Sequence, residues 1–160
     1  MFKVITCATD GSPHGDQALD CAKRLAEDQH AVLRVVHVVE KIYGGRVAGR
    51  NVRLDEDQII ARVKAQTAEL REHGIDASLH LVRGGQGQPG HEIAVSARDA
   101  MSDVLVVGTR GHSTVAGLLL GSVAQRLLHI APCPILVIPS SNAGAPSVDA
   151  GEQAAAASAG

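Results

Sequence analysis

Aromatic side chains are almost missing from this sequence, which has one Tyr, one Phe and no Trp among 160 residues. Ala and branched aliphatic side chains must therefore fill any core. A chain of this length can bury such a core within one ordinary domain. We expect regular aliphatic packing.

Cysteine is also scarce. Cys7, Cys21 and Cys133 are odd in number and far apart, a pattern that favours neither a disulfide framework nor a metal knuckle. We expect reduced, mostly buried thiols, with a reactive Cys7 as the minority alternative.

The eight histidines are scattered without the close pairs of a zinc site. His37, flanked by valines, is expected to be a hydrogen-bonded core residue.

The sequence has no excess of one charge and no long hydrophobic run. Its 15 basic and 17 acidic side chains give a formal charge of -2, so no positive field would draw it onto nucleic acid. No apolar run approaches the ~20 residues of a membrane-spanning helix. The first residues lack the pattern of an export signal. We expect a soluble, cytoplasmic protein that binds neither nucleic acid nor membrane.

Apolar residues follow two alternating periods along the chain. Compact β-branched runs predict five strands, at Phe2–Ala8, Ala31–Val39, Ile75–Val82, Asp103–Val107 and Ile135–Ile138. Helical spacing predicts four helices between them, at His14–Asp28, Leu54–His73, His91–Ala100 and Ser122–Ile130. Ser12 is suited to cap the first helix, Pro13 to begin it, and Gly74 to end the second.

Strict alternation of strands and helices predicts an α/β fold. Right-handed crossovers lay helices on both faces, giving a doubly wound five-stranded parallel sheet of Rossmann-like, nucleotide-binding type. Ligands of such sheets bind beyond the carboxyl ends of the strands, where the strand order reverses. We assign residues 1–139 to this domain. Residues 140–160 are rich in Ala, Ser and Gly and are expected to be a disordered tail.

The connection after the fourth strand has the composition of a phosphate cradle. Gly108 and Gly111 lack side chains where backbone would approach a ligand, and Gly121-Ser122 opens a helix whose free N–H groups suit phosphate oxygens. Ser122 is suited both to cap that helix and to offer its hydroxyl to phosphate. The simpler alternative is that these glycines only turn the chain.

Asp10 ends the first strand at the same predicted edge of the sheet. It can contact a ribose, hold a phosphate-bound magnesium ion, or make an Asx-turn before the first helix. Val38, at the end of the second strand, can offer backbone groups to an adenine edge. Arg110 and His112 can neutralise phosphate charge or be solvated loop residues.

These residues together resemble the universal stress protein family, specifically its ATP-binding branch. The resemblance rests on the spacing Gly108-x2-Gly111-x9-Gly121-Ser122 and on four further segments in register, namely 8–12, 37–38, 103–108 and 132–138. It covers residues 2–139. The loop from Arg83 to Pro89 and the tail after Pro139 are longer than is usual in the family.

The resemblance implies a binding and signalling module for ATP or another adenine nucleotide. The residues predicted to bind the nucleotide are Ala8, Thr9, Asp10, Val38, Val107, Gly108, Arg110, Gly111, His112, Gly121, Ser122 and Val123. It also implies a homodimer joined through the last strand, Ile135–Ile138, where pairing would cover an apolar sheet edge. Robust catalysis is not expected, and slow ATP hydrolysis or self-phosphorylation is the upper limit.

Several other functions are alternatives to this one. Cyclic AMP in place of ATP, and a stress protein that keeps the fold but binds nothing, both stay open. The glycines between Gly85 and Gly90 match a dinucleotide-binding pattern, but Pro89 removes an N–H there and Val107-Gly108 stands where the acidic residue is expected. A Rossmann oxidoreductase is therefore disfavoured. The absence of a Walker lysine motif argues against an ordinary P-loop enzyme.

Overall fold

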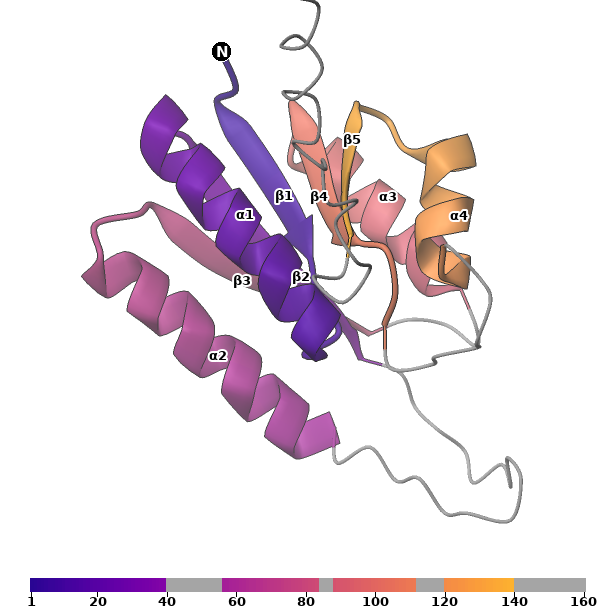
Figure 1. Cartoon of the computed structure of the whole chain (residues 1–160), viewed down its shortest axis with the longest axis horizontal. Helices are drawn as coiled ribbons and strands as arrows, with labels where there is room; N and C mark the ends of the chain where they lie inside the picture. The colour runs from indigo at the N-terminus through magenta and orange to yellow at the C-terminus, as the bar shows by residue number, and fades with distance from the viewer. Residues whose placement is uncertain (40–55, 84–87, 112–119, 140–160) are drawn as a thin grey trace, which may run out of the picture.

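The computed structural model describes residues 1–39, 56–83, 88–111 and 120–139. Within these ranges the chain alternates strands and helices in the predicted order (Figure 1). The elements are β1 (Val4–Ala8), α1 (Pro13–Gln29), β2 (Val32–Val39), α2 (Glu56–Glu72), β3 (Ala77–Arg83), α3 (Pro89–Asp99), β4 (Val104–Gly108), α4 (Ser122–Ile130) and β5 (Ile135–Ile138). The predicted tail and most of the predicted glycine-rich loop, residues 140–160 and 84–87, lie outside the described residues.

The five strands form one parallel sheet in the order β3-β2-β1-β4-β5. The chain proceeds from β1 outward to β3, then crosses back to β4 on the other side of β1. The strand order therefore reverses between β1 and β4, where Ala8 pairs in register with Val107. This confirms the predicted doubly wound fold and places the switch point at the carboxyl ends of these two strands.

Each face of the sheet is covered by two helices (Figure 1). On one face α1 and α2 pack on side chains such as Ile5, Val35 and Val106. On the other face α3 and α4 pack on Val36 and Leu105, among others. The buried hydrophobic side chains of the described residues are aliphatic, apart from the Cys7 thiol, as the sequence predicts. Strands covered on both faces explain the continuous apolar runs.

The helix ends follow local rules, and several elements begin or end one or two residues from the predicted bounds. Ser12 caps α1 by accepting a hydrogen bond from the Gly15 N–H at 3.1 Å, as predicted. The third strand begins later than expected, because the Ile75 N–H bonds the Leu70 carbonyl in closing α2 around Gly74. The third helix begins earlier, at Pro89, because a first-turn residue needs no N–H partner.

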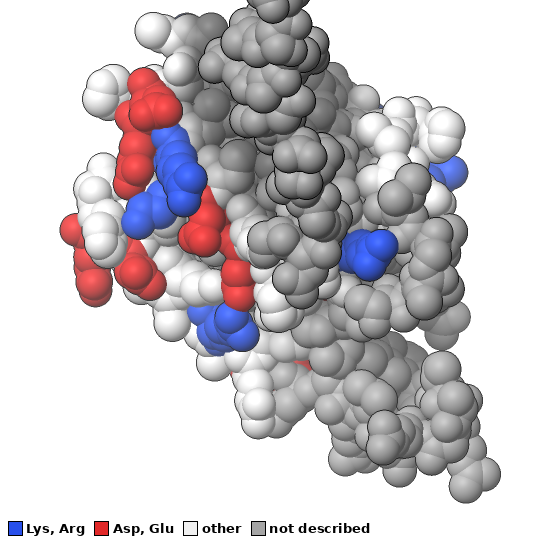
Figure 2. All heavy atoms as spheres, in the orientation of Figure 1, with Lys and Arg blue, Asp and Glu red and all other residues white. Residues whose placement is uncertain are grey.

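Charged side chains of both signs are mixed over α1 and α2 on the face shown in Figure 2. Asp16 joins the two helices by pairing with Arg62 and by accepting a hydrogen bond from the Gln66 amide at 2.8 Å. These contacts hold α2 against α1, so that the first turn of α2 lies near the carboxyl ends of the strands. Of the helices that the structure describes, none has the length and apolarity needed to cross a membrane.

Candidate functional site

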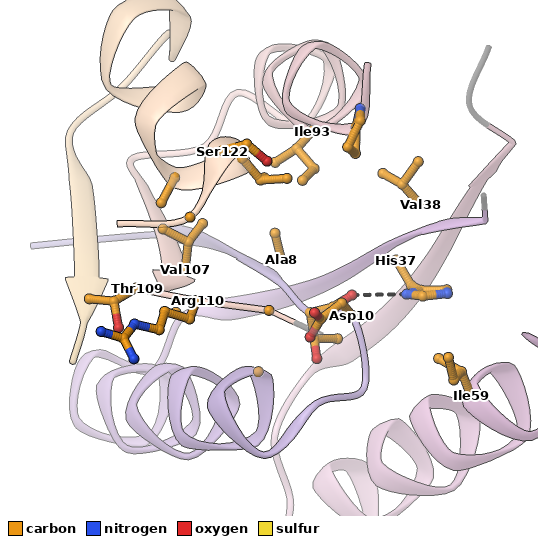
Figure 3. A pocket seen from close by; sticks show the side chains of 18 of the residues that line it. Ala8, Asp10, His37, Val38, Ile59, Ile93, Val107, Thr109, Arg110 and Ser122 are labelled. Atoms are coloured by element: carbon orange, nitrogen blue, oxygen red, sulfur yellow. Dashed lines mark hydrogen bonds between the residues drawn. The ribbon is translucent and has the colours of Figure 1, made fainter. Parts of the chain in front are cut away.

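A cavity of about 440 Å³ lies at the carboxyl ends of β1, β2 and β4, at the predicted switch point (Figure 3). The structure brings eleven of the twelve predicted site residues to its walls. They are Ala8, Thr9, Asp10, Val38, Val107, Gly108, Arg110, Gly111, Gly121, Ser122 and Val123. The twelfth, His112, lies outside the described residues. Segments far apart in the sequence therefore converge on one hollow.

The loop between β1 and α1 forms a compact turn. The Asp10 carboxylate accepts a hydrogen bond from the Ser12 N–H at 3.0 Å, and the Thr9 hydroxyl accepts one from the Gly11 N–H at 3.1 Å. Of the three roles predicted for Asp10, the Asx-turn is thus present in the structure. The turn uses Oδ1, while the other carboxylate oxygen, Oδ2, lies against the backbone of Gly111.

Gly108 and Gly111 stand where protein neighbours leave no room for a side chain. A Cβ atom on Gly108 would lie 2.9 Å from the His14 carbonyl oxygen, and one on Gly111 would lie 2.3 Å from Asp10 Oδ2. The sequence prediction gave close approach to a ligand as the reason for both glycines. The structure adds a reason internal to the protein: these glycines let the β4 connection pack directly on the first turn of α1 and on Asp10.

The N-terminus of α4 faces the cavity without a side-chain cap. Gly121 is the capping residue, and its N–H donates to the Thr109 carbonyl at 2.7 Å. The predicted capping role of Ser122 is wrong, because Ser122 is the first residue inside the helix and its hydroxyl makes no capping bond. Ser122, Val123 and Ala124 all line the cavity. The positive end of the helix dipole therefore lies at this wall.

Next to this wall, part of the cavity is apolar. Val38 and Ile93 lie on the side of α3 and α4, and Ala8 and Val107 lie at the floor between the strands (Figure 3). Sequence reasoning missed Ile93 and the contribution of Pro89 to this wall. The helical period shows that Ile93 faces inward, but only the packing of α3 against β2 shows that it borders a cavity.

His37 is a buried, hydrogen-bonded side chain, as predicted, and it also lines the cavity. Its Nδ1 lies 2.9 Å from the Thr9 carbonyl oxygen (Figure 3), and its Nε2 lies 2.7 Å from Glu56 Oε1. Sequence reasoning missed Glu56 and Ile59, the two residues of α2 at the cavity. No local motif marks them, because they reach the site only through the docking of α2.

The cysteines take no part in this cavity. Cys7 is fully buried in the core, and burial raises the pKa of its thiol far above the ordinary value, which disfavours the reactive thiolate. All three thiols are free. Across the described ranges there is no cluster of three or more His, Cys, Asp or Glu side chains that would hold a metal ion.

The family model described as "Universal stress protein family" matches residues 1–139. The chain belongs to the universal stress protein family. A universal stress protein of Thermus aquaticus is 34% identical over 140 residues, which cover 86% of this chain and 99% of the relative. The resemblance inferred from the sequence is thus confirmed at the level of the family.

Solved structures of universal stress proteins share the fold. The universal stress protein UspA from Lactobacillus plantarum superposes with a TM-score of 0.68 at 21% identity, covering 85% of this chain and 97% of that one. A universal stress protein solved in complex with cAMP superposes with a TM-score of 0.63 at 25% identity, covering 86% and 96%. The five-stranded parallel architecture is therefore that of the family.

Proposed function

We propose that this universal stress protein binds an adenine nucleotide, with ATP as the preferred ligand, and serves as a binding and signalling module. The observation that carries the proposal is the uncapped N-terminus of α4, which faces a cavity at the switch point of the sheet. Free N–H groups and a helix dipole form a site for phosphate oxygens. The family member solved with cAMP adds support for an adenine nucleotide.

The two parts of the cavity fit the two parts of a nucleotide. In this proposal the phosphates lie against Ser122, Val123 and the connection from Gly108 to Gly111, with Arg110 offsetting their charge. The base lies in the apolar part of the cavity, beside the backbone of Val38. Asp10 lies between the two parts, where its carboxylate can meet the ribose.

Magnesium would enter this site with the phosphates rather than alone. Mg²⁺ bound to nucleotides commonly keeps one or two carboxylates, phosphate oxygens and water as ligands. Asp10 is the carboxylate at the junction of the β1–α1 turn and Gly111, so the residues present fit such an ion. When bound, the ion would neutralise phosphate charge, while Asp10 would orient it.

The test of this function is calorimetric titration of the protein with ATP, ADP, AMP and cyclic AMP, each with and without magnesium. We expect ATP to bind most tightly, because it brings more phosphate oxygens to the α4 N-terminus than the other nucleotides do. Magnesium should tighten this binding further. Tightest binding of cyclic AMP would favour the cyclic-nucleotide alternative. No binding of any of them at millimolar concentration would favour a stress protein that keeps only the fold.

A steady-state ATPase assay separates a binding module from an enzyme. The proposal expects at most slow hydrolysis, because a binding and signalling module does not require catalytic turnover. A turnover of about 10 per second, typical of enzymes, would contradict it.

The cytoplasmic location predicted from the sequence stays a prediction.

We further propose that the protein forms a homodimer through β5. This strand is at the edge of the sheet, and Leu136 on it is 38% exposed, while Leu128 on α4 is 53% exposed. An apolar edge strand is a template for pairing with a second copy. We expect sedimentation to give a dimer for the wild type and a monomer for Leu136→Lys. A Leu136→Lys protein that stays dimeric would place the interface elsewhere.

A further inference from the structure

The cavity has an acidic side chain that the nucleotide-binding motif does not contain. Glu56 is the first residue of α2, and its side chain is 25% exposed at the cavity wall. One carboxylate oxygen, Oε1, lies 2.7 Å from Nε2 of the buried His37. Within the described ranges the second oxygen, Oε2, makes no hydrogen bond. Glu56 is thus held at one oxygen, and no described residue bonds the other.

Hydrogen-bond chemistry makes this pair neutral as a whole. The Thr9 carbonyl can only accept, so Nδ1 of His37 carries a proton. The short contact between Nε2 and Oε1 then needs a second proton, carried either by the imidazole or by the carboxyl group. In both cases the charges of His37 and Glu56 sum to zero. Glu56 can therefore accept a hydrogen bond inside a cavity that binds an anion, and the pair adds no net negative charge that would repel this anion.

The position of the His37–Glu56 pair determines which part of the ligand the pair would contact. Side chains alternate along β2, so His37 points to the side of α1 and α2 while Val38 points to the side of α3 and α4 (Figure 3). Asp10 lies next to His37, on the same side of the cavity, and Ile59 of α2 lies below them (Figure 3). The apolar space for a base is on the Val38 side. Glu56 is therefore placed toward the sugar.

We propose that Glu56 is a specificity-determining residue that accepts a hydrogen bond from a ribose hydroxyl of the nucleotide. His37 is the positioning residue that holds the carboxylate at the cavity wall. This inference rests on the proposed nucleotide-binding function and deepens it. It assigns recognition of the sugar to two elements, the β1–α1 turn through Asp10 and the first turn of α2 through Glu56.

The experiment is a binding cycle that combines protein variants with ligand variants. ATP, 2′-deoxy-ATP and 3′-deoxy-ATP are titrated into the wild type, Glu56→Ala and the matched control Asp57→Ala. Asp57 is the next residue of α2, is exposed and does not line the cavity. We expect the wild type and Asp57→Ala to bind at least one deoxynucleotide about tenfold more weakly than ATP, as for the loss of one hydrogen bond.

In Glu56→Ala that preference should fall toward unity, with the affinity for the same deoxynucleotide almost unchanged. A purely structural role of Glu56 would instead weaken all three ligands alike. A preference that survives in Glu56→Ala would assign sugar recognition to Asp10 alone and overturn the inference. Failure of the wild type to bind any of these ligands would instead refute the proposed function.

Thermal unfolding of each variant shows whether it is folded. If Glu56→Ala does not fold, Glu56→Gln serves in its place, because it keeps the length of the side chain and a hydrogen bond to His37. Its neutral amide oxygen is a weaker acceptor than a carboxylate. The preference for ATP should then shrink without vanishing, and an unchanged preference would again overturn the inference.

Discussion

Gly121→Leu is expected to weaken ATP binding by at least about 100-fold, which corresponds to about 2.8 kcal/mol, while leaving the protein folded. A Cβ atom at this position would meet the Thr109 carbonyl oxygen at 3.4 Å, an ordinary contact, with Arg110 Cα at 3.6 Å as the next neighbour. A longer side chain there fills the space between the α4 N-terminus and the β4 connection. The phosphates would lose that space and their hydrogen bonds to backbone N–H groups. Calorimetry measures the affinity.

The backbone gives no reason for Gly121→Leu to unfold. Gly121 has φ -71° and ψ 160°, an extended conformation open to any residue. Thermal unfolding should therefore resemble that of the wild type. Gly121→Ala is the control, because its single methyl group makes only the ordinary contact with Thr109 and is expected to weaken binding much less. A leucine variant with wild-type affinity would refute the proposed phosphate site.

Gly108→Ala is expected to lower the free energy of unfolding by about 1–3 kcal/mol, as overpacking of a close-packed site does. The added Cβ atom would lie 2.9 Å from the His14 carbonyl oxygen and 3.2 Å from the Arg110 carbonyl oxygen. Both are backbone atoms, so β4 and the first turn of α1 would have to move apart. Urea denaturation of the wild type and the variant measures the loss.

Gly121→Ala is again the matched control, since it is the same chemical change at the same cavity without a backbone clash. We expect its free energy of unfolding to stay within about 0.5 kcal/mol of the wild type. Gly111→Ala should lie between the two, because its Cβ atom would meet a side-chain atom, Asp10 Oδ2, and not the backbone. Equal stability of Gly108→Ala and Gly121→Ala would show that packing against α1 does not require a glycine at position 108.

The sequence predicted the architecture well because the signals for it are local. Ser12 and Gly74 act within a few residues, and they cap α1 and end α2 as expected. Ser122 shows the limit of such rules. A serine after glycine at a helix start fits two positions, and the structure makes Gly121 the cap and Ser122 the first helical residue. The third helix begins at Pro89 and the third strand at Ala77, each two residues from its predicted start, because local rules again fit more than one position.

The site residues were predicted from the spacing of a motif. The structure places those that belong to the motif and are described at one cavity. Asp10 and Gly111 were expected at one edge of the sheet, and the structure places them in direct contact. His112 lies outside the described residues. Glu56, Ile59 and Ile93 were missed because their types and spacing are those of ordinary helix residues. Their relation to the cavity depends on how α2 and α3 dock.

The amino-acid order alone determined the alternation of strands and helices, the aliphatic core and the glycine-bearing connection after β4, because these depend on periodicity and turn chemistry between near neighbours. Tertiary structure decided that the Gly108 backbone packs on His14 and that Glu56 pairs with His37. Such contacts join elements that the crossovers bring together. Their partners are fixed by the strand order and by helix docking, which no local pattern specifies.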